Sequence, residues 1–228
     1  MKGLELDKQQ VAAITTADQQ ARAYSKMLDY LAHQLRTESD IIKKLHDLET
    51  PEQFIEPILQ KLRDQHLVDD HEYAASYVRT EMITSLKGPG VIRQHLRMKK
   101  IGENDIDDAL AQFTSEQQQA NASKLAAKLF RRYHNQPLMR QEQKVQQGLL
   151  TKGYASGIFD QIREQVTPQE DPDEQEELLE KTAEKLWRRY RRYTGRERVQ
   201  HFKQGMFRCG FDLDRVQKWL DQQQEGLS

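Results

Sequence analysis

The sequence has very little cysteine and no long apolar run. Its single cysteine, Cys209, cannot form a disulfide within the chain, and no cysteine or histidine spacing resembles a zinc site, so we expect a buried structural thiol. No segment approaches the roughly 18 apolar residues of a membrane span. The opening MKGLELDKQQ lacks the apolar core of a signal peptide. These absences predict a soluble, cytoplasmic protein that does not contact a membrane.

Glycine and proline are also scarce, at 11 and 6 of 228 residues. Together with 31% charged residues this composition favours helix and disfavours a compact β-rich core. The hydrophobic fraction of 36% is low for one large globule of this length. We therefore expect an all-α protein, elongated, whose shallow core is shared among small modules.

The chain also lacks the residue sets that carry out catalysis. No Ser/His/Asp set, phosphate-binding loop or pair of catalytic carboxylates is present, which predicts a protein that is not an enzyme and has no cofactor. His66 and His71 flank Asp69 and Asp70 and superficially suggest a metal site. Helix capping explains the aspartates better, and a spacing of five does not align the histidines on one helical face. We expect no metal.

Residues 67–110 are the most informative stretch of the chain. Asp69 and Glu72 have capping-box spacing, which predicts that a helix begins there. The sequence KGPG at 87–90 ends this helix, since its glycines tolerate non-helical dihedrals and its proline suits the first turn of a following helix. A third helix from about 103 to 110 completes a three-helix unit.

The three-helix unit recurs along the chain. The words AKLFRRY at 127–133 and EKLWRRY at 184–190 lie 57 residues apart. The middle helices carry apolar residues at intervals of 51, 53 and 57, namely Leu45, Leu96, Leu149 and Met206. A unit of about fifty residues cannot bury its apolar face alone, so the pattern predicts a tandem array of helix-turn-helix-like modules.

We place the boundaries from caps and composition. Thr37 and Thr50 are the expected N-caps of the second and third helices of the first unit. The expected parts are an N-terminal fragment or extension (1–20), four three-helix repeats (21–66, 67–113, 114–166 and 178–228) and an acidic linker (167–177).

Charge is strongly polarised in the last third of the chain. Residues 167–180 contain seven acidic and no basic side chains, and residues 181–208 contain ten Lys or Arg and two Glu. Such asymmetry often marks a surface that faces nucleic acid or phosphate. We interpret 167–177, with its two prolines, as a solvated, flexible linker that lets the last unit move.

Three motifs occur in a recognisable order: LDYLAHQLRTESDIIKKL, LVDDHEYAASYV and KGPGVIRQHLRMKKIGENDIDDAL. In this order and spacing they resemble the RecX regulatory proteins, over about residues 21–166. The fourth unit is similar to that of longer members of the family, of the Gram-positive type. In longer relatives the opening KGLELD follows a further N-terminal stretch, so we expect this chain to lack that portion.

The resemblance implies partners that composition and spacing do not supply. RecX proteins act on the recombinase RecA: they bind RecA filaments on single-stranded DNA and suppress strand exchange, ATP turnover and stimulated cleavage of the LexA repressor. A role in homologous recombination, DNA repair and the SOS response follows from the resemblance. We also expect a monomer, although the sequence leaves the oligomeric state open.

Two groups of cations are the candidate binding sites for DNA phosphate or for the filament. The first lies in the second unit: Lys87, Arg93, Arg97, Lys99 and Lys100. Lys and Arg neutralise phosphates and release counterions, and the N–H groups after KGPG would add an anion-binding helix start. The alternative is an ordinary solvated helix face beside a Gly/Pro helix stop.

The second group spans the third and fourth units: Arg131, Arg132, Arg188, Arg189, Arg191 and Arg192. The alternative is that the acidic linker folds back onto these arginines and forms ion pairs within the chain. Binding and fold-back are both possible if the linker is a mobile mask that DNA phosphate displaces. Trp187 and Phe130 occupy equivalent repeat positions, and core packing explains them better than base stacking does.

The sequence therefore supports a non-enzymatic modulator lying along the groove of a recombinase–DNA filament. The main alternative is an autonomous helical-repeat protein that binds DNA or RNA and affects a filament only by competing for the strand. A purely structural adaptor is a more remote possibility.

Overall fold

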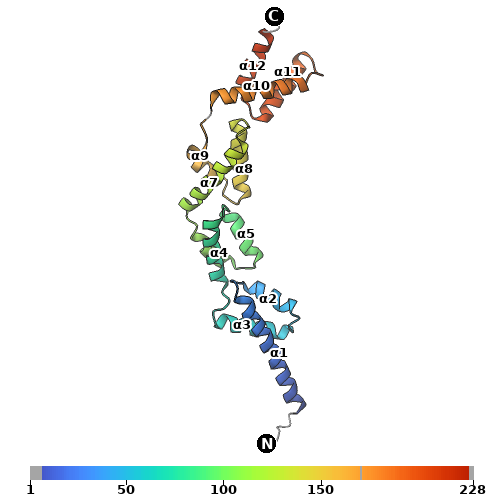
Figure 1. The fold of residues 1–228 in the computed structure, drawn as a ribbon, viewed down its shortest axis with the longest axis vertical. Helices are drawn as coiled ribbons and strands as arrows, with labels where there is room; N and C mark the ends of the chain where they lie inside the picture. Colours follow the sequence, from blue (N-terminus) through green and yellow to red (C-terminus); the bar gives the residue numbers. More distant parts are fainter. Residues whose placement is uncertain (1–6, 170, 226–228) are drawn as a thin grey trace. The chain divides into compact units, whose positions relative to one another are not determined.

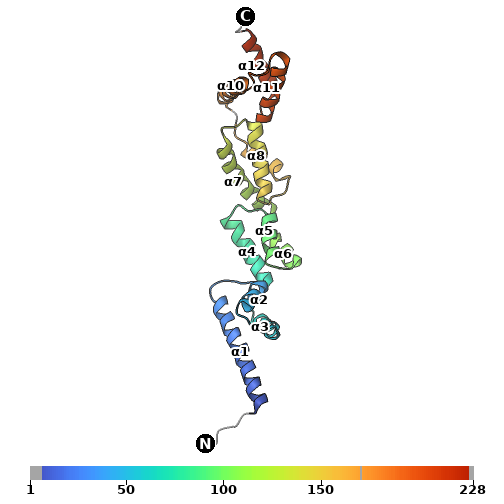
Figure 2. The same cartoon turned by 90° about the vertical axis from the view of Figure 1, so that its right-hand side faces the viewer.

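The structure is a computed structural model that describes residues 7–169 and 171–225. These residues form twelve α-helices and no strand, which confirms the predicted all-α class. The helices, drawn in Figures 1 and 2, belong in chain order to four apolar cores, three helices to each. No helix in the described part is long and apolar enough to cross a membrane.

The first two groups make up most of one compact unit, which comprises residues 1–85 and 91–114. The first domain contains α1 (Lys8–Leu31), α2 (Glu38–Asp47) and α3 (Glu52–Asp64). The second domain contains α4 (Asp70–Thr84), α5 (Pro89–Met98) and α6 (Glu103–Ala111).

The other compact unit comprises residues 86–90 and 115–228. Its third domain contains α7 (Ser115–Tyr133), α8 (Leu138–Thr151) and α9 (Ile158–Val166). Its fourth domain contains α10 (Pro172–Arg189), α11 (Gly195–Cys209) and α12 (Leu213–Glu225).

Each domain has its own apolar core. The residues that mark the repeat in the sequence lie on the middle helix of each domain, belong to its core and are at most 1% exposed: Leu45, Leu96, Leu149 and Met206. The recurring unit of about fifty residues is thus a packing unit. Cys209 is half-buried against the core of the fourth domain, less covered than expected.

Helix capping explains several helix starts. Thr37 is the N-cap of α2, as predicted, and it forms a capping box with Asp40. The Asp69 carboxylate accepts from the Glu72 N–H at 3.0 Å, although Glu72 itself binds Arg79. The Thr50 prediction is wrong, because α3 begins at Glu52 and Pro51 occupies the N-cap position.

The N-terminal helix is longer than the sequence indicated. Residues 1–20 were expected to be only a fragment or extension before the first repeat, but α1 begins at Lys8, where Asp7 and Gln10 form a capping box. In α1 only Ala23 and Met27 are buried. The first half of the helix therefore contributes no buried apolar residue to the core. In the sequence, only the capping residues Asp7 and Gln10 indicate where this helix begins.

The acidic segment is also more ordered than predicted. Helix α10 begins at Pro172, with Asp171 accepting from the N–H groups of Asp173 and Glu174. Acidic side chains in a first turn favour helix because they offset the positive end of its dipole. The prediction of a flexible linker is therefore wrong for 172–177, which are helical.

The KGPG turn packs by its backbone against the turn after α8. The Gly88 N–H donates to the Lys152 carbonyl at 2.7 Å, and the Gly90 N–H donates to the Gly153 carbonyl at 2.9 Å. A Cβ on Gly88 would lie 2.6 Å from Gly153 C and from Tyr154 N. Glycine at 88 is therefore required by close backbone packing as well as by the helix stop.

Candidate nucleic-acid interface

The basic stripe predicted on α5 is compensated by acids on α6. Arg93 binds Glu103 at 3.0 Å and Asp107 at 2.5 Å, and Arg97 binds Glu103 through Nε at 2.6 Å. Hydrogen bonds from Arg97 lower the pKa of Glu103 despite some desolvation. Both arginines thus have partners in place, which agrees with an ordinary solvated helix face better than with an open phosphate site.

The remaining cations of this first group differ in their surroundings. Lys99 Nζ donates to both carboxylate oxygens of Asp40, at 2.9 and 3.0 Å. Lys87 is half-buried beside the KGPG turn. Lys100 is exposed and lies in the turn after α5 in the left-handed conformation, with φ of 62°. The structure does not gather these side chains into one open surface.

Two N–H donors of the KGPG turn are not open to an anion. The Gly88 and Gly90 N–H groups donate to carbonyls of the turn after α8. A donor N–H that is already bonded to a backbone carbonyl is not available to a phosphate. This turn is a structural contact.

The third domain contributes two exposed arginines near the end of α7. Arg131 lines a hollow of about 190 Å³ together with His134 and Glu174. The Arg132 guanidinium lies 5.7 Å from the ring centroid of Tyr133. Phe130 is buried in the core of the domain, as predicted.

The fourth domain carries the most open group of cations. Arg188 and Arg189 end α10, Arg191 and Arg192 follow in the turn, and all four are exposed. Within residues 7–169 and 171–225 none of the four forms an ion pair with an acid. The C-terminal end of a helix favours cations, so the fold tolerates this concentration of positive charge.

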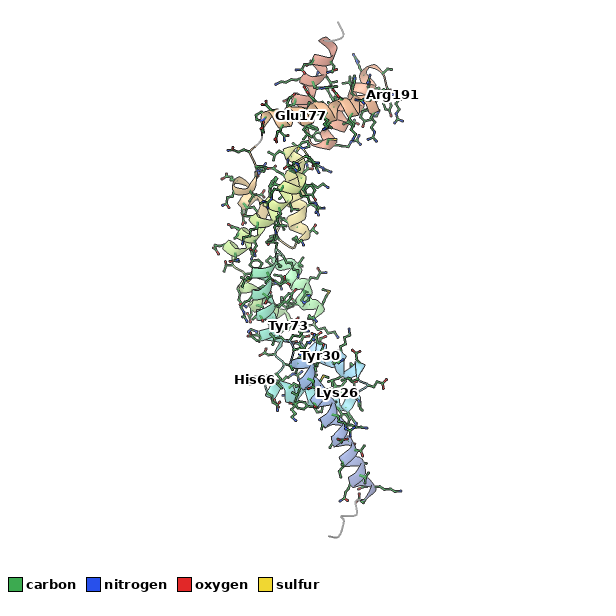
Figure 3. The ribbon with its side chains drawn as sticks, in the orientation of Figure 1. Lys26, Tyr30, His66, Tyr73, Glu177 and Arg191 are labelled. Atoms are coloured by element: carbon green, nitrogen blue, oxygen red, sulfur yellow. The ribbon has the colours of Figure 1, made fainter. Side chains whose placement is uncertain are left out.

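The acidic half of α10 does not lie on these arginines. Glu176 binds Arg215 of α12 at 2.8 Å. Residues 177 and 188 are separated by eleven positions of one helix, or roughly 16 Å at a rise of 1.5 Å per residue. Figure 3 shows Glu177 and Arg191 at separate places on the domain. The fold-back and mobile-mask interpretations are therefore wrong for 172–177, because a helix holds this segment apart from the arginines.

A groove of about 810 Å³ lies between the end of α10 and the start of α11. Its polar and aromatic lining combines four cations with two rings: Arg191, Arg196, Arg198, Lys203, Trp187 and Tyr193. The sequence prediction included only Arg191. The other three cations lie within the basic stretch 181–208 of the sequence but outside the predicted group of arginines.

Trp187 forms one wall of this groove. Its ring packs edge-on against Phe202 and Trp219, with centroids 5.2 and 6.1 Å apart. The Arg198 guanidinium covers it at 3.9 Å from the centroid and donates to the Trp187 carbonyl at 2.8 Å. Trp187 thus belongs to the packing of the domain, as the sequence indicated.

No metal centre accompanies this surface: among the residues that the structure describes, no three His, Cys, Asp or Glu side chains gather as a metal site would require. The chemistry of the fourth-domain surface is therefore that of cations, aromatic rings and amides. Cations neutralise phosphates and exposed rings stack on bases, so these groups are chemically suited to a polyanion.

Known proteins resemble the chain over nearly its whole length. The first three-helix domain of the RecX family matches residues 23–62, and the second matches residues 69–110. The third matches twice, at 116–162 and at 173–220. The double match of the third domain agrees with the internal repeat seen in the sequence.

Several relatives share the name regulatory protein RecX. That of Limosilactobacillus reuteri is 66% identical over 223 residues, which cover 98% of this chain and 84% of the relative. That of Levilactobacillus brevis is 48% identical over 219 residues, covering 96% and 82%. That of Enterococcus faecalis is 33% identical over 225 residues, covering 98% and 84%.

Two crystal structures share the fold. A regulatory protein RecX at 68% identity superposes with a TM-score of 0.69 over 72% of this chain and 81% of the other. RecX from Lactobacillus salivarius, at 41% identity, superposes with a TM-score of 0.63 over 66% of this chain and 97% of the other. The agreement of motifs, domain order and structure leads to one conclusion: the chain belongs to the RecX family of regulatory proteins.

Proposed function

We propose that this chain is a non-enzymatic regulator that binds RecA filaments on single-stranded DNA. It would inhibit strand exchange, ATP turnover and the stimulated cleavage of LexA. The observation that supports this most is the exposed row Arg188, Arg189, Arg191 and Arg192, which has no acidic partner among the described residues. Membership of the RecX family supports RecA as the partner.

A repeated domain suits a repetitive target. Four three-helix domains in one chain can contact several filament protomers, and weak contacts joined in one chain add through their effective concentration. Binding that blocks protomer addition while filament ends continue to dissociate would inhibit at few copies per filament. In this proposal the chain works as a monomer in the cytoplasm.

The alternative function is autonomous binding of DNA or RNA, with competition for the strand as the only effect on a filament. The same cationic row favours it, because Lys and Arg on an open surface bind any phosphate backbone. A structural adaptor is more remote, since no observation on this chain favours it specifically.

Sedimentation distinguishes these functions. RecA filaments are assembled on single-stranded DNA with a slowly hydrolysed ATP analogue and pelleted with increasing amounts of the chain. The proposal predicts that the chain pellets with the filament while RecA remains on the DNA. Displacement of RecA in proportion to the bound chain would favour competition, and absence of the chain from the pellet would contradict both.

The matched control is a variant with three exposed lysines of the third domain changed, Lys124→Gln, Lys128→Gln and Lys144→Gln. It has the same charge change as Arg188→Gln, Arg191→Gln and Arg192→Gln together. Pelleting of the arginine variant should weaken much more than that of the lysine variant. Equal weakening would mean that only net charge matters.

A further inference from the structure

The helix α11 presents a single stripe that combines cations, an amide and an aromatic ring. Arg196, Gln200, Lys203 and Phe207 follow one another at intervals of four, three and four residues. At 3.6 residues per turn these positions fall within an arc of roughly 60°. The first three line the groove of the fourth domain, and Phe207 continues the stripe by one turn.

The cations of this stripe are not neutralised in place. Arg196 is exposed and Lys203 is half-buried, and neither has an ion pair within the described part of the chain. The nearby acid, Glu197, lies about 100° round the helix from Arg196 and contacts His201 at 3.8 Å. The groove therefore keeps a net positive charge from Arg191, Arg196 and Lys203.

Phe207 is unusual among the aromatic residues of this domain. Its residue is 58% exposed, while Phe202 and Phe211 in the same domain are 0% and 5% exposed. An exposed phenyl ring gains nothing from the core, and a ring placed one turn after a cation can stack on a base whose phosphate the cation holds. Trp187 cannot serve in this way, because Arg198 covers its ring.

We propose that this groove and stripe bind single-stranded nucleic acid, with phosphates on Arg191, Arg196 and Lys203 and an unpaired base stacked on Phe207. This inference rests on the proposed function and names the strand-binding site within it. Charge complementarity selects a polyanion, and the exposed ring selects unpaired bases over a duplex, in which the base faces are already stacked. An acidic protein surface would use the cations but would not need the aromatic ring.

The first experiment measures binding of the full chain to a fluorescent single-stranded oligonucleotide, without any recombinase, over a series of salt concentrations. The double variant Arg196→Gln/Lys203→Gln should weaken binding about tenfold or more and reduce the salt slope by about 1.4, at roughly 0.7 for each phosphate contact. The control Lys181→Gln/Lys218→Gln removes the same charge from exposed positions of the same domain that do not line the groove. It should change affinity less than threefold.

The stacking contact needs its own pair of variants. Phe207→Leu should weaken binding about fivefold, and Phe207→Tyr should restore it, because tyrosine keeps the aromatic face. An unchanged affinity for Phe207→Leu would contradict the stacking, and equal losses for the groove variant and the lysine control would contradict the groove. If the variant Arg196→Gln/Lys203→Gln lost binding to RecA filaments but bound the oligonucleotide like the wild type, the groove would contact the recombinase, and the proposal would be overturned.

A second readout needs no change at the groove surface. In a Trp219→Phe variant, Trp187 is the remaining tryptophan and lines the groove. Saturation with the oligonucleotide should change its emission, and an unchanged emission would contradict the site. The two oligonucleotide assays contain no RecA, whereas the proposed function is tested by RecA inhibition with the wild-type chain. Failure of this inference is therefore distinguishable from failure of the proposed function.

Discussion

Lys99, in the turn after α5, donates to both carboxylate oxygens of Asp40 on α2, at 2.9 and 3.0 Å, although 59 residues separate them in the sequence. The side chains are only 29% and 18% exposed. Burial by itself would raise the pKa of Asp40, but hydrogen bonds from Lys99 and Thr37 bring it below its usual value. Lys99 is thus a tertiary contact between the first two domains.

We expect Lys99→Gln to lower the stability of these domains without changing DNA binding. A partly buried ion pair of this geometry contributes about 1–2 kcal/mol, because hydrogen bonds to charged groups are stronger than neutral ones. Chemical denaturation should show this loss. The control Lys100→Gln, at the exposed neighbouring residue, should leave the denaturation midpoint unchanged. If Lys99→Gln alone weakened the affinity for the oligonucleotide, Lys99 would belong to the binding surface and the prediction would be contradicted.

The stability of the first domain should fall in acid because of Glu38. Arg63 binds both of its carboxylate oxygens, at 2.7 and 2.6 Å, and these hydrogen bonds lower the pKa of Glu38 below 4.5, against an opposing effect of burial. A carboxyl with a lowered folded-state pKa stabilises the fold above its unfolded pKa, and this contribution is lost as the pH falls through the folded value.

Glu38→Gln should therefore be less stable than the wild type near neutral pH and should lose less stability on going below about pH 4.5. Asp70 has the opposite effect on the pH dependence of stability, because burial raises its pKa and disfavours its ionised form in the folded state. Urea midpoints across this pH range provide the measurement. Glu56→Gln is the matched control, because Glu56 binds the same arginine but is 69% exposed, and equal pH profiles for the two variants would contradict the assignment.

A methyl group at position 88 should disrupt the contact of the KGPG turn. Gly88→Ala would place its Cβ 2.6 Å from backbone atoms of Gly153 and Tyr154, which cannot shift as a side chain can. We expect a loss of about 1–3 kcal/mol, as for other overpacked sites, and faster hydrogen exchange at the Gly90 amide. Gly157→Ala should be nearly neutral because no atom lies within 4 Å of its Cβ. Similar unfolding of both variants would contradict the close contact.

The arginine row should set the salt dependence of DNA binding. Removing Arg188, Arg191 and Arg192 together, as Gln, should reduce the slope of log affinity against log salt by about 2, at roughly 0.7 per single-strand phosphate contact. The lysine variant of the third domain, with the same charge change, should keep the wild-type slope. An unchanged slope for the arginine variant would remove this row from the DNA footprint.

The repeats were predictable because the signal was local and periodic. Leu45, Leu96, Leu149 and Met206 recur at nearly constant spacing and are all buried, so the apolar pattern alone identified the packing unit. The start of α2 followed from Thr37 for the same reason, since a capping box involves only four consecutive residues.

The ion pairs were not predictable, because they depend on tertiary placement. Arg93 and Arg97 form a basic stripe in the sequence, and only the packing of α6 brings Glu103 to both of them. Composition was misleading at 172–177, where dense negative charge suggested a linker but the Asp171 cap and Pro172 start a helix. In the groove, Arg196 and Lys203 come together with Trp187 only when α10 and α11 pack.

The most direct test of the proposed function is RecA ATPase activity on single-stranded DNA, with this chain titrated well below the recombinase concentration. The account predicts strong inhibition at these substoichiometric amounts, because a few bound chains would block filament growth. Inhibition only when the chain saturates the DNA would favour competition for the strand. No inhibition at any ratio would contradict the account.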